Sequence, residues 1–425
     1  MPDFDLIIRH AEGQPFVGIA EGKIAALSGN GTAASEIDAA GLLLLPGVID
    51  AHVHFNEPGR TDWEGLETGS RAAAAGGVTT FFDMPLNSDP PTVTAEAFRA
   101  KAALAAEKSV VDFALWGGLV PGHVDDLEAL RDAGAIGFKA FMSGSGIAEF
   151  PSADLRTLRE GMKHAARLGV LVAVHAELDH LHRESGHTIR DYLASRPIAS
   201  EVAAIRAACD IAGETGGALH IVHVSSAAGV TAVAEAAAQG VDVTCETCPH
   251  YLFLNEADVE RLGAVAKCAP PIRSELERAA LLQCVRDGGI QTIGSDHSPA
   301  PTSMKQDVNF FRIWGGISGV QHLLPILLEL NLTPVEIVRL TSTNVANRFQ
   351  LRSKGGLEIG RDADFVLVSQ TPETVTAESL HYRHRQSPYI GETFHATVVR
   401  TLLRGQTVWE RSHGFSKGRG RLVTP

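Results

Sequence analysis

The chain has 425 residues, of which 44% are hydrophobic and 20% are charged, a composition that argues against intrinsic disorder. Its 37 Lys and Arg residues against 50 Asp and Glu residues give a formal net charge of -13, which disfavours nucleic acid or an anionic membrane as the main partner. The five cysteines are an odd number in a long chain, so they predict reduced thiols and a cytoplasmic protein rather than a disulfide framework.

The two ends of the chain both read as short strands. The acidic start, Met1 to Asp5, does not look like a basic secretion signal, and no stretch approaches the ~20 apolar residues of a membrane span. Apolar runs predict strands at 5–9, 16–20, 23–27, 364–368 and 396–408. Each flank is too short to bury a two-layer core alone, so we expect residues 1–49 and 351–425 to form one small β-sandwich-like domain.

Residues 50–350 alternate brief apolar runs with Ala-rich helical stretches. The predicted strands are 48–53, 78–83, 111–117, 136–141, 170–174, 219–223, 241–246 and 291–295. Helical patterns lie between most of them, at 63–75, 95–107, 153–168, 201–215 and 226–239. Eight strands alternating with helices over about 300 residues favour a TIM-like (β/α)8 barrel in the α/β class. A doubly wound open sheet is the alternative, although no G-x-G-x-x-G follows the first strand.

The first barrel strand ends in His52-Val53-His54. Because side chains alternate across a strand, the two histidines point to the same side, where two imidazoles can bind one metal ion. An isolated H-x-H pair is equally compatible with two ordinary histidines at a strand end. This motif therefore needs support from the other strands.

Four further predicted strands carry a polar residue at or near their C-terminal ends: Lys139, His175, His223 and Asp296. A lysine inside an apolar strand is unfavourable unless it is paired or chemically altered. Catalytic residues of such barrels come from the C-terminal ends of several strands. With the H-x-H pair, five of the eight predicted strands end in a potential metal ligand or its precursor, which argues against separate structural roles for these residues.

The chain resembles the amidohydrolase superfamily. Within it the chain is most similar to the cyclic-amidase branch, and within that branch to the allantoinases. The resemblance runs from the Pro-Gly-Val-Ile-Asp-Ala-His-Val-His segment at 46–54 to Gly-Gly-Leu-Glu-Ile-Gly-Arg-Asp-Ala-Asp at 355–364. The motifs that carry it are His-Phe-Asn-Glu-Pro-Gly-Arg at 54–60, Asp-Met-Pro-Leu-Asn-Ser at 83–88, Glu-Thr-Cys-Pro-His-Tyr-Leu at 246–252, Lys-Cys-Ala-Pro-Pro-Ile-Arg at 267–273 and Ser-Asp-His-Ser-Pro at 295–299.

The resemblance implies two divalent metal ions, with zinc expected and iron, manganese or cobalt as alternatives. It implies that His52, His54 and Asp296 bind one ion and that His175 and His223 bind the other. It further implies that Lys139 reacts with CO₂ and that the resulting carboxylate bridges both ions. A metal-bridging hydroxide would then attack the amide, and Asp296, as the catalytic residue, would take its proton and pass it to the leaving nitrogen.

The substrate expectation rests on fewer residues. Dihydroorotases resemble the chain closely, but typically have Arg where this chain has Asn56, and an anionic substrate would therefore lose its bidentate cation here. We expect instead a small neutral cyclic ureide, allantoin, that is opened to allantoate in purine catabolism. The expected substrate contacts are Asn56, Asn87, Ser88, His250 and Ser298, while a loop-capping role for Asn56 and a structural role for His250 stay open.

Two other functions compete with this interpretation. One is another ring amidase, a dihydroorotase, hydantoinase or dihydropyrimidinase; the other is a non-catalytic dihydropyrimidinase-like scaffold, which the complete ligand set disfavours.

The resemblance also implies a homotetramer. Residues 300–313 depart from the pattern of the allantoinases, so their effect on the pocket is open. We expect Arg60, Glu177 and Arg273 to pair beside the site rather than to contact substrate.

Overall fold

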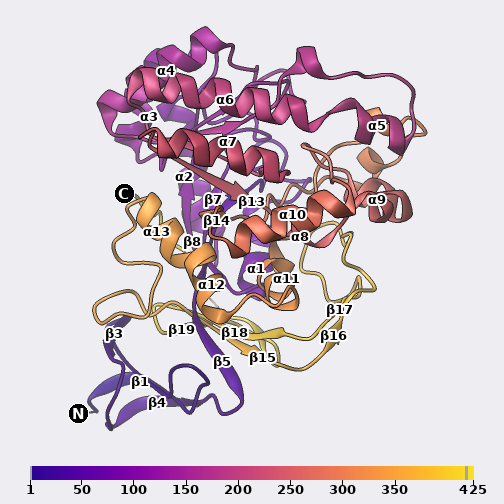
Figure 1. Cartoon of the computed structure of the whole chain (residues 1–425). Coiled ribbons are helices and arrows are strands. Elements are labelled where there is room, and N and C mark those ends of the chain that lie inside the picture. The colour runs from indigo at the N-terminus through magenta and orange to yellow at the C-terminus, as the bar shows by residue number, and fades with distance from the viewer. Residues whose placement is uncertain (1, 417–419) are drawn as a thin grey trace.

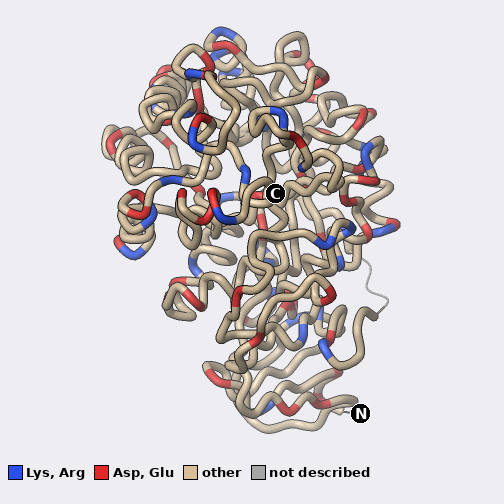
Figure 2. Tube along the Cα trace, turned by 90° about the vertical axis from the view of Figure 1, so that its right-hand side faces the viewer, with Lys and Arg blue, Asp and Glu red and all other residues tan. Residues whose placement is uncertain are grey.

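The computed structural model describes residues 2–416 and 420–425. A body of strands and helices forms the upper part of the view, and layers of strands from both ends of the chain lie below it (Figure 1). Acidic and basic residues are interspersed along the traced chain (Figure 2). Within the described ranges, no helix combines the length and apolar character that would be needed to cross a membrane.

The body is a closed parallel barrel. Its strands are β6 Val48–Val53, β7 Val78–Asp83, β8 Asp112–Leu115, β9 Gly117–Gly118, β10 Phe138–Phe141, β11 Val172–His175, β12 Leu219–Ile221, β13 Val243–Thr247 and β14 Thr292–Ile293. They pair in chain order, with β8 and β9 as two halves of one interrupted strand. A parallel bridge between Val53 and His297 joins the last strand to the first. The expected (β/α)8 barrel is therefore confirmed, and the open-sheet alternative is wrong.

Helices surround the barrel strands. Their bounds are α1 Leu66–Ala75, α2 Ala95–Lys108, α3 Leu127–Ala133, α4 Leu155–Leu168, α5 Ile189–Ser195, α6 Ile198–Thr215, α7 Ala227–Ala238, α8 Pro249–Phe253, α9 Glu256–Leu262, α10 Glu275–Arg286, α11 Leu323–Glu329, α12 Pro334–Val338 and α13 Asn344–Arg348. Thr94, Asp154 and Ser226 begin α2, α4 and α7 as N-caps, each accepting a backbone N–H three residues on. Helix α1 begins at Leu66 rather than at Trp63, because Gly65 has a φ of 93° that a helix does not allow.

The small domain joins both ends of the chain. One sheet has the order β3-β2-β1-β4 and the other the order β20-β19-β18-β15-β5. The bounds are β1 Phe4–Arg9, β2 Phe16–Ala20, β3 Lys23–Ala26, β4 Ala33–Asp38, β5 Leu42–Pro46, β15 Phe365–Ser369, β18 Thr397–Leu403, β19 Gln406–Glu410 and β20 Gly414–Phe415. Strand β5 pairs antiparallel with β15, which ties the N-terminal segment to the C-terminal one. Strands β4 and β5 were not among the predicted elements.

Strand β15 forms a layer between the small domain and the barrel. Its side chains alternate, as a strand requires. Phe365 and Leu367 pack with residues of β1 and β2, whereas Val366 and Val368 pack in the large core of the barrel. Two parts of the segment 351–425 also contact the barrel directly: Arg383 N donates to Glu64, and Leu422 bridges to Phe113 of β8. These contacts fix the barrel relative to the small domain.

A buried cation links the barrel to the small domain. Lys354 Nζ lies 2.6 Å from an oxygen of Asp112 in β8, 2.6 Å from Asp364 and 3.0 Å from Asp362. Burial alone would lower the pKa of Lys354, but the carboxylates of Asp364 and Asp112 raise it above its ordinary value. The ammonium is therefore the charge that holds these acids together in the interior.

We expect Lys354→Met to destabilise the protein strongly, because buried carboxylates would lose their cation. Breaking a buried ion pair from one side costs about 3–5 kcal/mol. Urea unfolding followed by circular dichroism measures the loss, with Lys163→Met, at an exposed lysine of α4, as the matched control. A loss below about 1 kcal/mol, as for exposed pairs, would contradict the assignment.

Candidate metal centre

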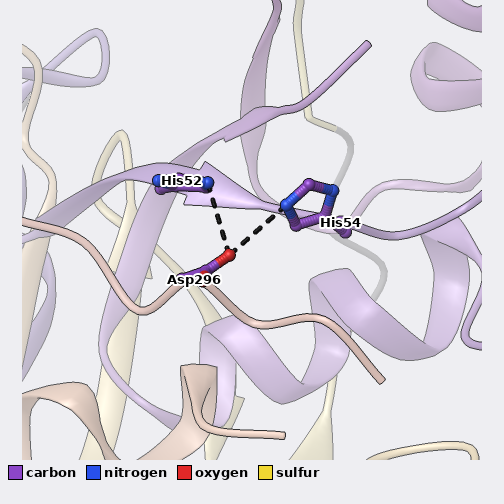
Figure 3. Close-up of side chains that lie close together, drawn as sticks. All are labelled: His52, His54 and Asp296. Atoms are coloured by element: carbon purple, nitrogen blue, oxygen red, sulfur yellow. Dashed lines mark ion pairs between the residues drawn. The ribbon is translucent and has the colours of Figure 1, made fainter. Parts of the chain in front are cut away.

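The first group of predicted ligands meets at the ends of the first and last barrel strands. His52 Nε2 and His54 Nε2 each lie 3.3 Å from Asp296 Oδ1 (Figure 3). His52 belongs to β6 and His54 follows it, while Asp296 lies three residues beyond β14. Asp296 has a φ of 45°, a left-handed conformation that Asp tolerates better than most residues. The turn aims its carboxylate at the two imidazoles, and the three donors can hold one ion.

Glu246 of β13 fixes the tautomer of His52. Its Oε1 lies 2.7 Å from His52 Nδ1, so this nitrogen carries the proton and the lone pair of Nε2 faces Asp296. Burial alone would raise the pKa of Glu246, but the neighbouring His52 lowers it to about 2. Glu246 is thus an ionised acceptor behind a candidate metal ligand, a role that the sequence did not indicate.

The second group lies on the neighbouring strands. His175, the last residue of β11, and His223, just after β12, approach each other with His175 Nδ1 2.9 Å from His223 Nε2. His175 Nε2 lies 2.9 Å from Glu177, so the proton sits on Nε2 and the lone pair of Nδ1 faces His223. Arg196 binds both oxygens of Glu177, which completes the pairing that was expected for this glutamate.

Lys139 of β10 is fully buried, and its amine has no hydrogen-bond partner among the described residues. The charge of Lys139 acts on His175 and His223, and the charge of Asp296 acts on Lys139, so its amine is coupled electrostatically to both groups. Burial lowers the pKa of Lys139 to about 7. A substantial fraction of the Lys139 amine is therefore unprotonated at neutral pH, and the unprotonated amine is the form that can react with CO₂.

The ionisation states suit metal binding. Burial lowers the pKa of His54, His175 and His223, which keeps their imidazoles neutral and their lone pairs free. Burial alone would raise the pKa of Asp296, but His52 and His54 hold it below its ordinary value. Four imidazoles, one carboxylate and an unpartnered amine form a nitrogen and oxygen donor set that fits divalent ions such as zinc.

These residues lie at the base of a cavity of about 320 Å³. His52, His54, His175, His223 and Asp296 all line it. Of the five predicted substrate contacts, Asn87 and Ser298 line the cavity as well. This volume suits a single small ring rather than a polymer.

The other three predicted contacts, Asn56, Ser88 and His250, are not among the residues that line the cavity. Asn56 Nδ2 donates to Pro299 O at 3.3 Å, and Ser88 Oγ donates to Pro85 O at 3.4 Å, so both hold loops. His250 is buried, neither of its ring nitrogens has a partner among the described residues, and burial lowers its pKa to about 4. A nitrogen of His250 lies within 4.8 Å of an oxygen of Asp296.

Three arginines at or near the cavity are bound by protein groups. Arg60 donates to the carbonyl of Asn87 at 3.1 Å, and Arg273 donates to Ser225 and to the carbonyl of Arg196. Arg196 itself lines the cavity but is held by Glu177. An exposed Arg312 also lines the cavity. The sequence did not single out Arg196 or Arg312: Arg196 lies outside the motifs, and Arg312 belongs to the segment 300–313, whose effect on the pocket was left open.

Comparison with known proteins supplies the family. A family model described as "Amidohydrolase family" matches residues 43–408. The chain is 51% identical to an allantoinase of Rubrobacter xylanophilus, covering 100% of this chain and 98% of that protein. It is 48% identical to an allantoinase of Deinococcus radiodurans, covering 99% and 97%.

Solved structures agree with the fold. The L-hydantoinase (dihydropyrimidinase) of Arthrobacter aurescens superposes with a TM-score of 0.96 at 32% identity, covering 99% of this chain and 100% of that one. The dihydropyrimidinase of Brevibacillus agri superposes with a TM-score of 0.88 at 30% identity, covering 99% and 97%. Similarity in sequence and in structure thus extends over essentially the whole chain.

Proposed function

The chain belongs to the amidohydrolase family, and from this premise we propose how its metal centre opens a ring. The protein is a cyclic amide hydrolase, and its similarity to allantoinases over its whole length supports allantoin as the substrate and allantoate as the product. The reaction adds one water across a ring C–N bond, which gives a carboxylate and a freed nitrogen. The observation that carries this function is the combination of that similarity with a donor-lined cavity of about 320 Å³.

Amidohydrolases generally use a binuclear metal centre. We propose that His52, His54 and Asp296 hold one ion here and that His175 and His223 hold the other. We propose that carboxylated Lys139 bridges the two ions, since its buried amine has no partner among the described residues. Zinc is the ion that we expect from these nitrogen and oxygen donors, and metal analysis of the purified protein tests this choice.

Metal ions bound at these donors would supply Lewis-acid polarisation of the amide and a strongly acidified water. The protein's own contribution is positioning and proton transfer. Asp296 has a low pKa and is ionised at neutral pH, so it can accept a proton within the cavity and return it to the leaving ring nitrogen. Glu246 and Glu177 keep His52 and His175 in the tautomers that present a lone pair to the site.

The residues that line the cavity support a substrate without a net charge. The Asn87 amide and the Ser298 hydroxyl line it, and both can donate to and accept from ureido and imide groups. Of the cations that line the cavity, Arg196 is bound to Glu177 and Lys267 to backbone carbonyls. A substrate carboxylate would therefore have to break an existing contact or reach Arg312 at the surface of the cavity.

We expect the enzyme to hydrolyse allantoin far better than dihydroorotate, because the carboxylate of dihydroorotate would be buried without a free cation. Loss of one bidentate charge pair corresponds to roughly 2–5 kcal/mol, or a factor of tens to thousands in kcat/KM. Measuring kcat/KM for both compounds on the same zinc-, manganese- and cobalt-loaded preparations tests the substrate.

Arg312→Ala is the informative companion variant. If the carboxylate of dihydroorotate contacts no cation in the cavity, the Arg312→Ala substitution should leave the low kcat/KM for dihydroorotate unchanged. Equal or higher wild-type efficiency on dihydroorotate than on allantoin would overturn the substrate assignment. Loss of such activity in Arg312→Ala would then identify Arg312 as the cation responsible.

A further inference from the structure

One wall of the cavity is a segment with little regular structure. The wall segment, residues 310–316, follows the short helix η4 Thr302–Lys305 and begins with the helical turn η5 Phe310–Arg312. Six of its residues line the cavity: Phe311, Arg312, Ile313, Trp314, Gly315 and Gly316. With no strand or long helix to fix it, its position depends on contacts from outside the segment.

Lys267 makes the first set of these contacts. Its Nζ donates to three carbonyl oxygens of the wall segment, at 2.7 Å to Phe310, 3.1 Å to Phe311 and 2.5 Å to Ile313. The backbone carbonyl of Lys267 also accepts from Gly316 N at 2.7 Å. An ammonium has three N–H donors and no acceptor, so these carbonyls use all of its donors.

Lys305 repeats the arrangement from the other side. Its Nζ donates to Trp314 O at 2.9 Å and to Gly316 O at 2.7 Å, with a third contact to Ala264 O at 3.2 Å. Five of the six carbonyls bound by the two lysines therefore belong to the wall segment. The two ammonium groups hold it by its backbone, which leaves its side chains to shape the cavity.

Neither ammonium has a carboxylate within 4.0 Å among the described residues. In this the two lysines differ from two other buried lysines, which are ion-paired. Lys101 lies 2.9 Å from Asp83, and Lys354 lies among three aspartates. Burial lowers the pKa of Lys267 to about 8, and burial with the nearby charge of Lys267 lowers that of Lys305 to about 7. Two buried amines that hydrogen-bond to backbone carbonyls and not to carboxylates are not explained by ion pairing, so a local role in holding those carbonyls explains them better.

We propose that Lys267 and Lys305 are positioning residues for ring opening, whose ammonium groups hold residues 310–316 at the cavity and so set the affinity for the cyclic ureide. This inference rests on the proposed function for its substrate. The proposed metal ligands lie on the barrel strands or within three residues of their ends, whereas the wall segment closes the space in which the ring is held. Loosening the wall should therefore weaken substrate binding more than it affects metal loading or chemistry.

The test uses Lys267→Met and Lys305→Met in the metal-loaded full-length protein, with Lys163→Met as the matched control at an exposed lysine. We expect each wall variant to raise KM for allantoin about 10-fold while kcat changes less than about 3-fold, with metal content unchanged. Lys267→Arg should fail to restore KM, because a planar guanidinium cannot direct three donors at the same three carbonyls.

A second readout does not depend on turnover. Trp314 lies in the wall, with its ring centroid 4.8 Å from that of Trp63. Acrylamide quenching of tryptophan fluorescence should increase in both Met variants, and this increase should vanish when Trp314→Phe is added. If wild-type protein failed to open allantoin, the proposed function would fail, while the quenching result would still test the wall.

Unchanged KM together with unchanged quenching would overturn the proposal. Restoration of KM by Lys267→Arg would also overturn it, since charge alone would then suffice. Loss of folding or of metal in both Met variants, seen by circular dichroism and metal analysis, would also overturn it, because the two lysines would then stabilise the fold rather than position the wall segment.

Discussion

Lys139→Ala should lose both its metal complement and its activity on allantoin. The amine of Lys139 is fully buried and its charge acts on both His175 and His223, and its carboxylated form is the proposed bridge. Removing that bridge leaves the ions without a shared ligand. Because bound metal supplies several kcal/mol of stabilisation to the transition state, kcat/KM should fall by about 10³-fold or more. Metal analysis and steady-state rates on the same sample measure both effects.

Rescue distinguishes this role from simple loss of packing. A short carboxylic acid such as propionate can enter the space left by the side chain and should restore part of the metal content and rate. Lys163→Ala, at an exposed lysine, serves as the control for loss of a lysine side chain. Wild-type metal content and turnover in Lys139→Ala would remove the carboxylated lysine from the account.

Asp296→Asn should keep the fold and lose turnover by about 10²–10⁴-fold, the usual contribution of a general base. Asn tolerates the left-handed backbone at this position, where φ is 45°, so the main chain need not move. An amide, however, cannot accept the proton and is a poorer metal ligand. Rates with allantoin at saturating metal, together with circular dichroism, separate the chemical loss from any loss of folding.

The pH profile gives a sharper criterion for the same residue. His52 and His54 hold the pKa of Asp296 below its ordinary value, so its carboxylate is protonated only at acidic pH. Wild-type kcat should therefore decline on the acidic side, where this carboxylate titrates as one unit with the metal centre. Nearly normal kcat in Asp296→Asn, with the same acidic limb, would exclude Asp296 as the base.

The barrel was predictable because its strands and helices leave local patterns in the sequence. Apolar runs at 48–53 and 78–83 became β6 and β7 with the expected bounds. The polar residues at the strand ends could be read as a site because parallel strands bring these ends together. This places His52, His54 and Asp296 at the same end of the barrel, although more than 240 residues separate Asp296 from the other two, and the resemblance then assigns the three to one ion.

Contacts made through loops and buried partners were not predictable in the same way. Glu246 is 194 residues from His52, and nothing local shows that its carboxylate reaches that imidazole. The alternation rule does not apply to Asn56, which follows β6 with a φ of 65° and donates to the carbonyl of Pro299. Lys267 likewise binds carbonyls that follow it by more than 40 residues, where the sequence departs from the pattern of the allantoinases.

A metal titration of the chelated protein tests the central claim most directly. Metal-free protein in bicarbonate buffer is titrated with zinc while formation of allantoate from allantoin is followed. The account predicts no activity without metal and a linear rise that breaks at about two ions per chain. Full activity in the metal-free protein, or no allantoate at any metal content, would contradict it.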